Sequence, residues 1–297
     1  MKTAPHILIT GGAGFLARRL IRRLIDDHKV SAVMRDSRAE RECDVEHIYI
    51  DLTAAGFQDH LPDNVDCVIH LAQSSHYRHF PEGAEDMYRV NIAATLQLLE
   101  WARKVEVKQF IFASTANVYG NSMGLLTESD PTQPESFYGA SKLAAEHLVR
   151  QYQTFFQVDI LRIFTMYGPG QKGMLIPGII DRIRTGQPIT LAGGVGLYLM
   201  PIYVDDVVAA IRKLVGTPAR TQVRLLNACG DRVTHLGEIT TLLGAAMGCQ
   251  ANIQFTDGGA LCFTGSNEAL KRCLGPLRFT DIETGLRLTV SGEKLFC

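Results

Sequence analysis

The chain has 297 residues, and at about 150 residues per domain this length predicts roughly two domains. Hydrophobic residues make up 46% and charged residues 21%, a composition that excludes a disordered or fibrous chain. Thirty basic and thirty-one acidic side chains give a formal net charge of −1, so the overall charge does not indicate a nucleic-acid or membrane partner.

The sequence also argues against a membrane segment and a metal site. No apolar run reaches the roughly 18 residues of a membrane span, and the stretch from Ile7 to Ile9 is too short for a signal-peptide core. We therefore expect a cytoplasmic protein. The seven cysteines are scattered without a C-x-x-C pair, which predicts free thiols. His70, His76 and His79 lack a carboxylate at ligand spacing, so we expect core or cleft-rim histidines and no metal.

Apolar segments rich in β-branched residues alternate with amphipathic segments over the first 165 residues. The predicted strands are His6 to Thr10, Val30 to Met34, His47 to Ile50, Cys67 to Leu71, Gln109 to Ala113 and Val158 to Ile163, and the clearest predicted helices are Gly14 to Asp27, Glu85 to Lys104 and Tyr138 to Tyr152. Because continuous apolar strands are buried on both faces, the pattern predicts a doubly wound α/β fold, with a parallel Rossmann sheet between helices.

The composition changes from about Tyr167 onward, where frequent glycine and proline residues divide the sequence into short segments. We therefore predict a dinucleotide-binding Rossmann domain over residues 1–165 and a smaller, mixed substrate-binding domain over 166–297.

A glycine-rich turn, Gly11-Gly12-Ala13-Gly14, stands between the first predicted strand and the first predicted helix. Glycine lets the backbone turn sharply and lets a pyrophosphate approach the amides at a helix N-terminus. This context favours a dinucleotide site over a purely structural turn, with Gly11, Gly14, Phe15 and Leu16 along the cofactor.

The end of the second predicted strand bears on the choice of cofactor. An acidic residue there binds the adenosine ribose, whereas an arginine accommodates a 2′-phosphate. Arg35 takes the place of the acid and Arg38 could support it, which favours NADP(H). Asp36 is one residue away, so NAD(H) is the alternative.

Tyr138 and Lys142 are four residues apart, a spacing that puts both side chains on one face of a helix. A nearby ammonium stabilises a phenolate, so we expect Lys142 to lower the pKa of Tyr138 toward the range that acid/base catalysis of hydride transfer needs. Ser114 and Thr115 end the fifth strand at the carboxyl edge of the sheet, where open α/β folds bind their ligands.

Several motifs together carry a family resemblance. They are Gly11-x-x-Gly14-x-x-Ala17, Asp51-Leu52, His70-Leu71-Ala72, Ser114-Thr115-Ala116-Asn117-Val118-Tyr119-Gly120, Tyr138-x-x-x-Lys142, Arg162 with Tyr167-Gly168-Pro169, and Tyr203-Val204-Asp205-Asp206. In this order they resemble an extended short-chain dehydrogenase/reductase, and more narrowly the NAD-dependent epimerase/dehydratase family, which mostly acts on nucleotide-activated sugars.

The resemblance implies the roles of the site residues. Tyr138 would be the acid/base, Lys142 would bind the nicotinamide ribose and tune Tyr138, and Thr115 would hydrogen-bond the reacting oxygen. The remaining implied positions are Asp51 and Leu52 near the adenine, Leu71 and Ala72 along the cofactor, Asn91 as a structural helix residue, and a helix pair that forms a homodimer.

Two departures from the family pattern narrow the reaction. Ala116 and Asn117 stand where sugar 4,6-dehydratases have an Asp-Glu pair, and neither can donate or accept the required proton, so dehydration is not expected. The arginine that commonly clamps the substrate diphosphate is absent before Tyr203, which leaves Lys172 or Arg182 as candidate replacements.

The sequence therefore predicts hydride transfer at a carbinol or ketone carbon, most plausibly C4 of a nucleotide-activated sugar, by an epimerase or a 4-ketoreductase. The alternatives are a reductase of a non-sugar ketone or aldehyde, and a non-enzymatic NADP-binding redox sensor.

Overall fold

The computed structural model describes residues 4–36, 42–120, 124–217, 222–259, 261–275 and 277–292. The chain folds into two compact units. One takes Met1–Gly120, Pro131–Arg162 and Val208–Leu226, and the other takes Asn121–Asp130, Ile163–Val207 and Asn227–Cys297. Both units therefore draw on both sides of residue 165, and the roles given to 1–165 and 166–297 remain predictions.

The first unit is built on a seven-stranded sheet in the order β11-β6-β5-β4-β1-β2-β3. Its strands are β1 (His6–Thr10), β2 (Lys29–Met34), β3 (Glu46–Tyr49), β4 (Cys67–His70), β5 (Gln109–Thr115), β6 (Gln157–Ile163) and β11 (Val223–Ala228). β1 pairs in parallel with both β2 and β4, so the chain order reverses beside it. This is the switch point at which open α/β sheets bind ligands, and the predicted Rossmann class is confirmed.

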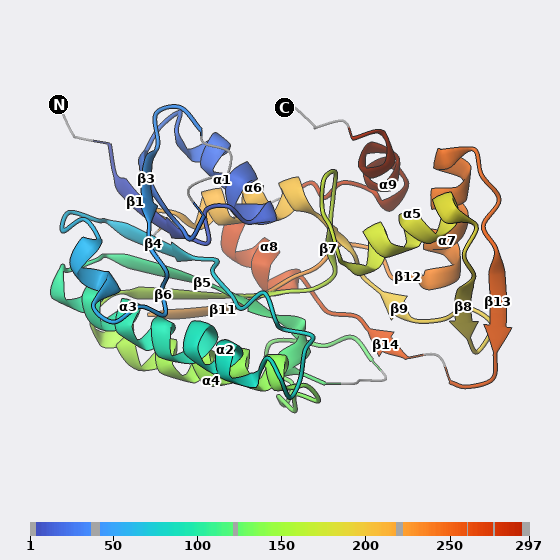
Figure 1. Cartoon of the computed structure of the whole chain (residues 1–297), viewed down its shortest axis with the longest axis horizontal. Helices are drawn as coiled ribbons and strands as arrows, with labels where there is room; N and C mark the ends of the chain where they lie inside the picture. Colours follow the sequence, from blue (N-terminus) through green and yellow to red (C-terminus); the bar gives the residue numbers. More distant parts are fainter. Residues whose placement is uncertain are drawn as a thin grey trace. The chain divides into compact units, whose positions relative to one another are not determined.

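Helices cover both faces of this sheet (Figure 1). On one face lie α1 (Phe15–Leu24) and α6 (Val204–Leu214), and on the other lie α2 (Ala84–Met87), α3 (Ala94–Lys104) and α4 (Phe137–Gln151). The apolar stripe of α1, with Leu16, Leu20 and Leu24 buried, explains why this segment packs on the sheet.

The predicted helix from Glu85 to Lys104 is interrupted. Residues Tyr88–Ala93 form a π-helical turn, η2, between α2 and α3. A π-helical turn accommodates an extra residue within a helix and is frequent at functional sites.

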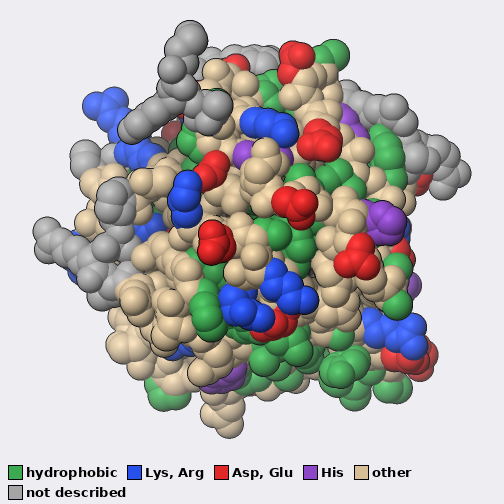
Figure 2. Space-filling model, turned by 90° about the vertical axis from the view of Figure 1, so that its left-hand side faces the viewer, with side chains coloured by type: hydrophobic (Ala, Val, Ile, Leu, Met, Phe, Trp, Pro, Cys, Tyr) green, Lys and Arg blue, Asp and Glu red, His purple; other side chains and the backbone are tan. Residues whose placement is uncertain are grey.

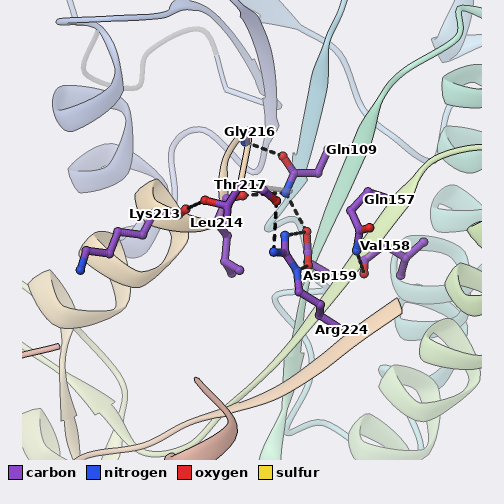
Figure 3. Close-up of polar contacts among 9 residues, drawn as sticks. All are labelled: Gln109, Gln157, Val158, Asp159, Lys213, Leu214, Gly216, Thr217 and Arg224. Carbon is purple, nitrogen blue, oxygen red and sulfur yellow. Dashed lines mark hydrogen bonds and ion pairs between the residues drawn. The ribbon is translucent and has the colours of Figure 1, made fainter. Parts of the chain in front are cut away.

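The amino edge of the sheet is closed by a polar network between β5, β6, β11 and the end of α6 (Figure 3). Gln109 Nε2 donates to Asp159 Oδ2 (2.7 Å) and to the Leu214 carbonyl (2.8 Å), and Gln109 Oε1 accepts from the Gly216 amide (2.8 Å). Arg224 forms a two-pronged ion pair with the fully buried Asp159, with Nη2 2.9 Å from Oδ2. The buried carboxylate is therefore fully compensated.

The second unit has its own core and smaller sheets. Its elements are β7 (Met166–Tyr167), α5 (Leu175–Thr185), β8 (Ile189–Ala192), β9 (Tyr198–Leu199), β10 (Ile202–Tyr203), β12 (Thr234–His235), α7 (Leu236–Met247), β13 (Ile253–Thr256), β14 (Cys262–Phe263), α8 (Glu268–Leu274) and α9 (Ile282–Ser291). β7 pairs in parallel with β10, and β8 with β13. Ile176, Ile180, Leu199, Leu243 and Leu286 belong to one buried cluster that α5, α7 and α9 share.

Figure 2 shows acidic and basic side chains intermixed on the face it presents, in keeping with the balanced charge of the sequence. Over the described residues, no helix is long and apolar enough to cross a membrane. The same residues hold no cluster of three or more potential metal ligands, and their six cysteines are free thiols.

Candidate active site

The glycine turn packs closely against the segment that follows β4. Gly11 has a φ of +71°, and a Cβ at this position would lie 2.9 Å from both the Cα and the N of Ala72. Gly14 donates its N–H to the Gly11 carbonyl (2.8 Å) and caps α1, which has neither a side-chain cap nor an acidic residue in its first turn. The amides at the start of α1 are thus left for an anion such as a pyrophosphate.

The other predicted cofactor residues lie along the same carboxyl edge. Leu71 and Ala72 are half-buried directly after β4, and the Ala72 amide donates to Thr10 Oγ1 (3.3 Å). Asp51 is exposed after β3, where its Oδ1 accepts from both the amide and the hydroxyl of Thr53 (each 2.8 Å). Leu52 beside it is buried.

Arg35 and Asp36 directly follow β2, and both are exposed. Burial acts to raise the pKa of Asp86 in α2, whereas hydrogen bonds from two neighbouring side chains and the charge of Arg35 lower it, and the net pKa is lowered. The guanidinium therefore lies near the start of α2 as well as the end of β2. Arg38, the predicted support for Arg35, lies outside the described residues.

Helix α4 carries the predicted catalytic pair. Ser136 caps the helix by accepting the N–H of Gly139 (3.1 Å), and a Cβ at Gly139 would lie 2.5 Å from the Asn117 carbonyl. Any side chain at position 139 would therefore collide with this carbonyl, so glycine is needed here for α4 to approach the end of β5.

Lys142 is buried one turn after Tyr138, with its Nζ 4.1 Å from the centre of the Phe112 ring. Burial lowers the pKa of Lys142 to about 7, and the charge of Glu146 opposes this shift. The lysine therefore changes its charge near neutral pH.

The Tyr138 hydroxyl donates to Gln73 Oε1 (2.8 Å) and is also hydrogen-bonded to Thr115. Burial raises the pKa of Tyr138 above its ordinary value, and the bond with Thr115 opposes this rise. The structure thus brings Tyr138 and Thr115 into contact and places Lys142 beside the same strand, β5. The predicted lowering of the Tyr138 pKa is wrong for this chain by itself, because burial of the phenol raises this pKa.

Thr115 ends β5 and caps a short 3-10 turn, η3 (Ala116–Val118). Its Oγ1 accepts from the amide of Asn117 (3.2 Å) and from Asn117 Nδ2 (3.1 Å). Ala116 is fully buried. A methyl group and an amide already bonded to Thr115 therefore occupy the positions after the predicted catalytic threonine.

Sequence reasoning missed a buried hydrogen-bond chain beneath the site. His70 bridges Thr10 (Nδ1 to Oγ1, 2.6 Å) and Thr95 (Nε2 to Oγ1, 2.9 Å), and the Thr95 hydroxyl donates to the carbonyl of Asn91. Burial, and to a smaller extent Lys142, lower the pKa of His70 to about 3, so its imidazole is neutral.

Asn91 lies in the π-helical turn and joins two segments of the site. Its Oδ1 accepts from the amide of Ser74 (2.9 Å), and its Nδ2 donates to Ser141 Oγ in α4 (2.9 Å). Asn91 is fully buried, and these two bonds account for its polar side-chain atoms.

A buried ion pair supports α4 from behind. Glu146 accepts from Arg162 Nη2 (2.7 Å) and Nε (3.0 Å) and from the Ser114 hydroxyl (2.5 Å). The pair fixes the turn of α4 that follows Lys142 against β5 and β6.

The two candidate substrate cations belong to the second unit. Lys172 is exposed in the loop before α5. Arg182 is exposed on α5, and its Nη1 donates to the Pro188 carbonyl (2.8 Å). Their contact with a substrate remains a prediction.

Comparisons with known proteins show the family of this chain. A model of the NAD-dependent epimerase/dehydratase family matches residues 7–229. A protein of Bacillus subtilis (strain 168) named uncharacterized UDP-glucose epimerase YtcB is 30% identical, over 84% of this chain and 85% of YtcB. The dTDP-glucose 4,6-dehydratase of Neisseria gonorrhoeae is 32% identical, over 71% of this chain and 69% of its own. The structure of MoeE5 in complex with UDP-glucuronic acid and NAD is 28% identical, with a TM-score of 0.85 over 97% of this chain and 98% of MoeE5.

Proposed function

Because the chain belongs to the NAD-dependent epimerase/dehydratase family, we propose that it transfers hydride between a nicotinamide dinucleotide and C4 of a nucleotide-activated sugar. The observation that carries this proposal is the Tyr138 hydroxyl in contact with Thr115, with the buried Lys142 one turn further along α4. This set lies at the carboxyl edge of the sheet, where the glycine turn leaves helix amides for a phosphate.

The residues fit a dinucleotide. Backbone groups of Gly11, Gly14, Phe15 and Leu16 would hold the pyrophosphate. The remaining contacts would come from Asp51 and Leu52 at the adenine, Leu71 and Ala72 along the chain of the cofactor, and Lys142 with Tyr138 at the nicotinamide ribose. A bound nicotinamide supplies or accepts the hydride.

In this proposal Tyr138 holds or takes the proton at the sugar oxygen, and Thr115 orients that oxygen by a hydrogen bond. Lys142, with its pKa near 7, supplies positive charge beside the phenolate as it forms. An epimerase would retain its cofactor and return the hydride to the opposite face, whereas a 4-ketoreductase would release oxidised cofactor.

The relatives include a 4,6-dehydratase, so the reaction class has to rest on the residues of this chain. Dehydration needs a proton donor and a base beside the threonine. The buried methyl of Ala116 and the amide of Asn117 provide neither, which supports oxidation and reduction at one carbon.

Arg35 supports NADP(H) as the cofactor, because a guanidinium matches a 2′-phosphate. The NAD bound to MoeE5 favours NAD(H) as the alternative. MoeE5 also binds UDP-glucuronic acid, which supports a UDP-sugar as substrate, with Lys172 or Arg182 at its diphosphate. A homodimer remains a prediction.

The test is turnover of UDP-glucose, UDP-glucuronic acid and dTDP-glucose by the purified protein with NAD+, NADP+, NADH and NADPH. Products are identified by NMR, and reduced nicotinamide is followed by its absorbance. Inversion at C4 without net change of the cofactor supports an epimerase, and net formation of reduced nicotinamide together with a 4-keto sugar supports a 4-ketoreductase running in its oxidative direction. Release of a 6-deoxy-4-keto sugar would overturn the exclusion of dehydration, and cofactor binding without turnover of any sugar would favour a redox sensor.

A further inference from the structure

Gln73 follows the predicted cofactor residues Leu71 and Ala72, and its side chain accepts the hydroxyl proton of Tyr138 (2.8 Å between OH and Oε1). In the orientation found here the amide oxygen of Gln73 accepts from this hydroxyl, so the bond as it stands stabilises the phenol. We propose that Gln73 is a positioning residue that keeps Tyr138 protonated until the oxygen of the sugar takes its place. This inference rests on the acid/base role proposed above for Tyr138.

The segment that carries Gln73 is fixed to the helix that carries Tyr138. Ser74 donates its amide to Asn91 Oδ1, and Asn91 Nδ2 donates to Ser141 of α4 (each 2.9 Å). The Ser74 hydroxyl donates to Asp86 in α2. The contact between Gln73 and Tyr138 is thereby pre-organised from both sides.

The Gln73 side chain is also easy to displace. Gln73 is exposed, whereas Ser74 beside it is buried. Within the described part of the chain, the bond to Tyr138 is the one side-chain hydrogen bond of Gln73. A single neutral hydrogen bond contributes about 1 kcal/mol, which an incoming alcohol or carbonyl oxygen can replace.

Two other ionisable groups, Tyr77 and Asp86, contact Tyr138 or the segment that carries Gln73. The Tyr77 ring lies 5.4 Å from the Tyr138 ring, and its charge when ionised would oppose a second phenolate. Burial acts to raise the pKa of Asp86, but bonds from Ser74 and His76 lower it, so Asp86 is a carboxylate already engaged by these two partners.

Two buried groups of the site, His70 and Glu146, have hydrogen-bond partners of their own. His70 in β4 is neutral, and Glu146 is bound by Arg162 and Ser114. Lys142, one turn further along α4, is the group that changes its charge near neutral pH. If it supplies positive charge to the phenolate, as proposed above, then Gln73 and Lys142 act in opposite directions on the same proton.

These opposing effects of Gln73 and Lys142 on the proton of Tyr138 suit the reduction of a ketone. In this reaction the O–H bond of Tyr138 would break and its proton would go to the carbonyl oxygen, leaving a phenolate, while a bound reduced nicotinamide would supply the hydride for the new C–H bond. Gln73 keeps the phenol ready for this step, and it must give way before Tyr138 can act as a base in the reverse direction.

The test is the ionisation of Tyr138 itself, measured in protein saturated with NAD+ or NADP+. Tyrosine labelled with ¹³C at Cζ gives one resonance for each tyrosine, and Tyr138→Phe identifies the one that matters. Gln73→Leu removes the acceptor and should lower the pKa of Tyr138 by roughly half a unit to one unit. Gln73→Glu places a carboxylate against the hydroxyl and should raise it. Gln151→Leu, a change at an exposed glutamine at the end of the same helix, should leave it unchanged.

The acidic limb of the pH profile of kcat/KM should move in the same two directions. Tyr138 signals that behave alike in the wild type, Gln73→Leu and Gln73→Glu, whether they titrate together or not at all, would overturn the proposal. Separated signals without turnover of any sugar would keep the link between Gln73 and Tyr138 and refute the proposed function. Turnover that depends on Tyr138 but not on Gln73 would support the proposed function and refute the role of Gln73.

Discussion

The amino and carboxyl edges of the seven-stranded sheet differ in the surroundings that each gives to a buried ionisable side chain. At the amino edge, the buried Asp159 is bound by Arg224 and Gln109, and the network leaves no charge without an opposite partner or hydrogen bond (Figure 3). At the carboxyl edge, Lys142 is buried against the ring of Phe112, and burial has lowered its pKa to about 7. The first arrangement compensates a buried charge with partners, whereas the second disfavours the charged form of a buried amine.

The presence of a hollow does not distinguish the carboxyl edge of the sheet from the amino edge. A hollow of roughly 440 Å³ lies at the amino edge, lined by residues that include Asp66, Cys67, Lys108 and Gln109. Lys108 is paired with Asp66, Gln109 is fully hydrogen-bonded, and burial raises the pKa of the Cys67 thiol, which makes it unreactive. The hollow alone therefore does not mark the candidate active site.

The largest expected effect is on the pH dependence of stability, to which Lys142 at the carboxyl edge contributes. Between pH about 7 and about 10.5 the unfolded chain binds a proton at Lys142 that the folded chain has released, so stability should rise with pH across this window. Lys142→Met should remove up to roughly 5 kcal/mol of this dependence and stabilise the protein at neutral pH. Chemical denaturation at several pH values measures it, and an unchanged slope would contradict the placement of a titrating lysine here.

The amino edge should respond with the opposite sign. Asp159→Ala leaves the guanidinium of Arg224 buried without its partner, so the free energy of unfolding should fall by roughly 3–5 kcal/mol. Lys108→Ala breaks the exposed ion pair with Asp66 at the same edge and should cost about 1 kcal/mol or less. Equal losses for the two variants in urea denaturation would remove the contrast between the edges.

Turnover should depend on the carboxyl edge alone. Tyr138→Phe should reduce kcat by at least about 100-fold with cofactor affinity nearly unchanged, because an acid/base group is lost without loss of packing. Tyr152→Phe is the matched control, since this tyrosine bonds Glu100 and not a residue of the site. Steady-state kinetics with the substrate found in the turnover screen measures both variants, and full activity of Tyr138→Phe would refute its catalytic role.

Cofactor choice should show a further effect at the carboxyl edge. Arg35→Asp should weaken NADP(H) binding by roughly ten-fold to somewhat more than a hundred-fold, because a charge-assisted contact is lost, while NAD(H) binding holds or improves. Titration of both cofactors by fluorescence or calorimetry measures it. A wild type that already prefers NAD(H), or equal losses for both cofactors, would assign the ribose to Asp36 or to backbone groups.

The sequence predicts the regular parts of this molecule well. β1 occupies its predicted residues, and the other predicted strands agree to within two residues at each end, because their buried apolar runs are continuous. Periodicity did not predict the π-helical turn at Tyr88–Ala93, which interrupts the predicted helix.

The site was predicted where it depends on spacing within one segment, as for Tyr138 and Lys142. Gln73 and the bridging bonds of Asn91 depend on contacts between segments that are distant in sequence, so no local pattern indicated them. The sign of the Tyr138 pKa shift was wrong for a related reason, because burial is a property of the folded chain.

The three-segment make-up of the first unit has a consequence for synthesis on the ribosome. Arg224 follows Asp159 by 65 residues, a delay of about 3–13 s at translation rates of about 5–20 residues per second. During this interval β6 is complete, but its carboxylate lacks the partner that makes burial favourable. The amino edge of the nascent sheet should therefore remain incomplete until β11 has left the exit tunnel.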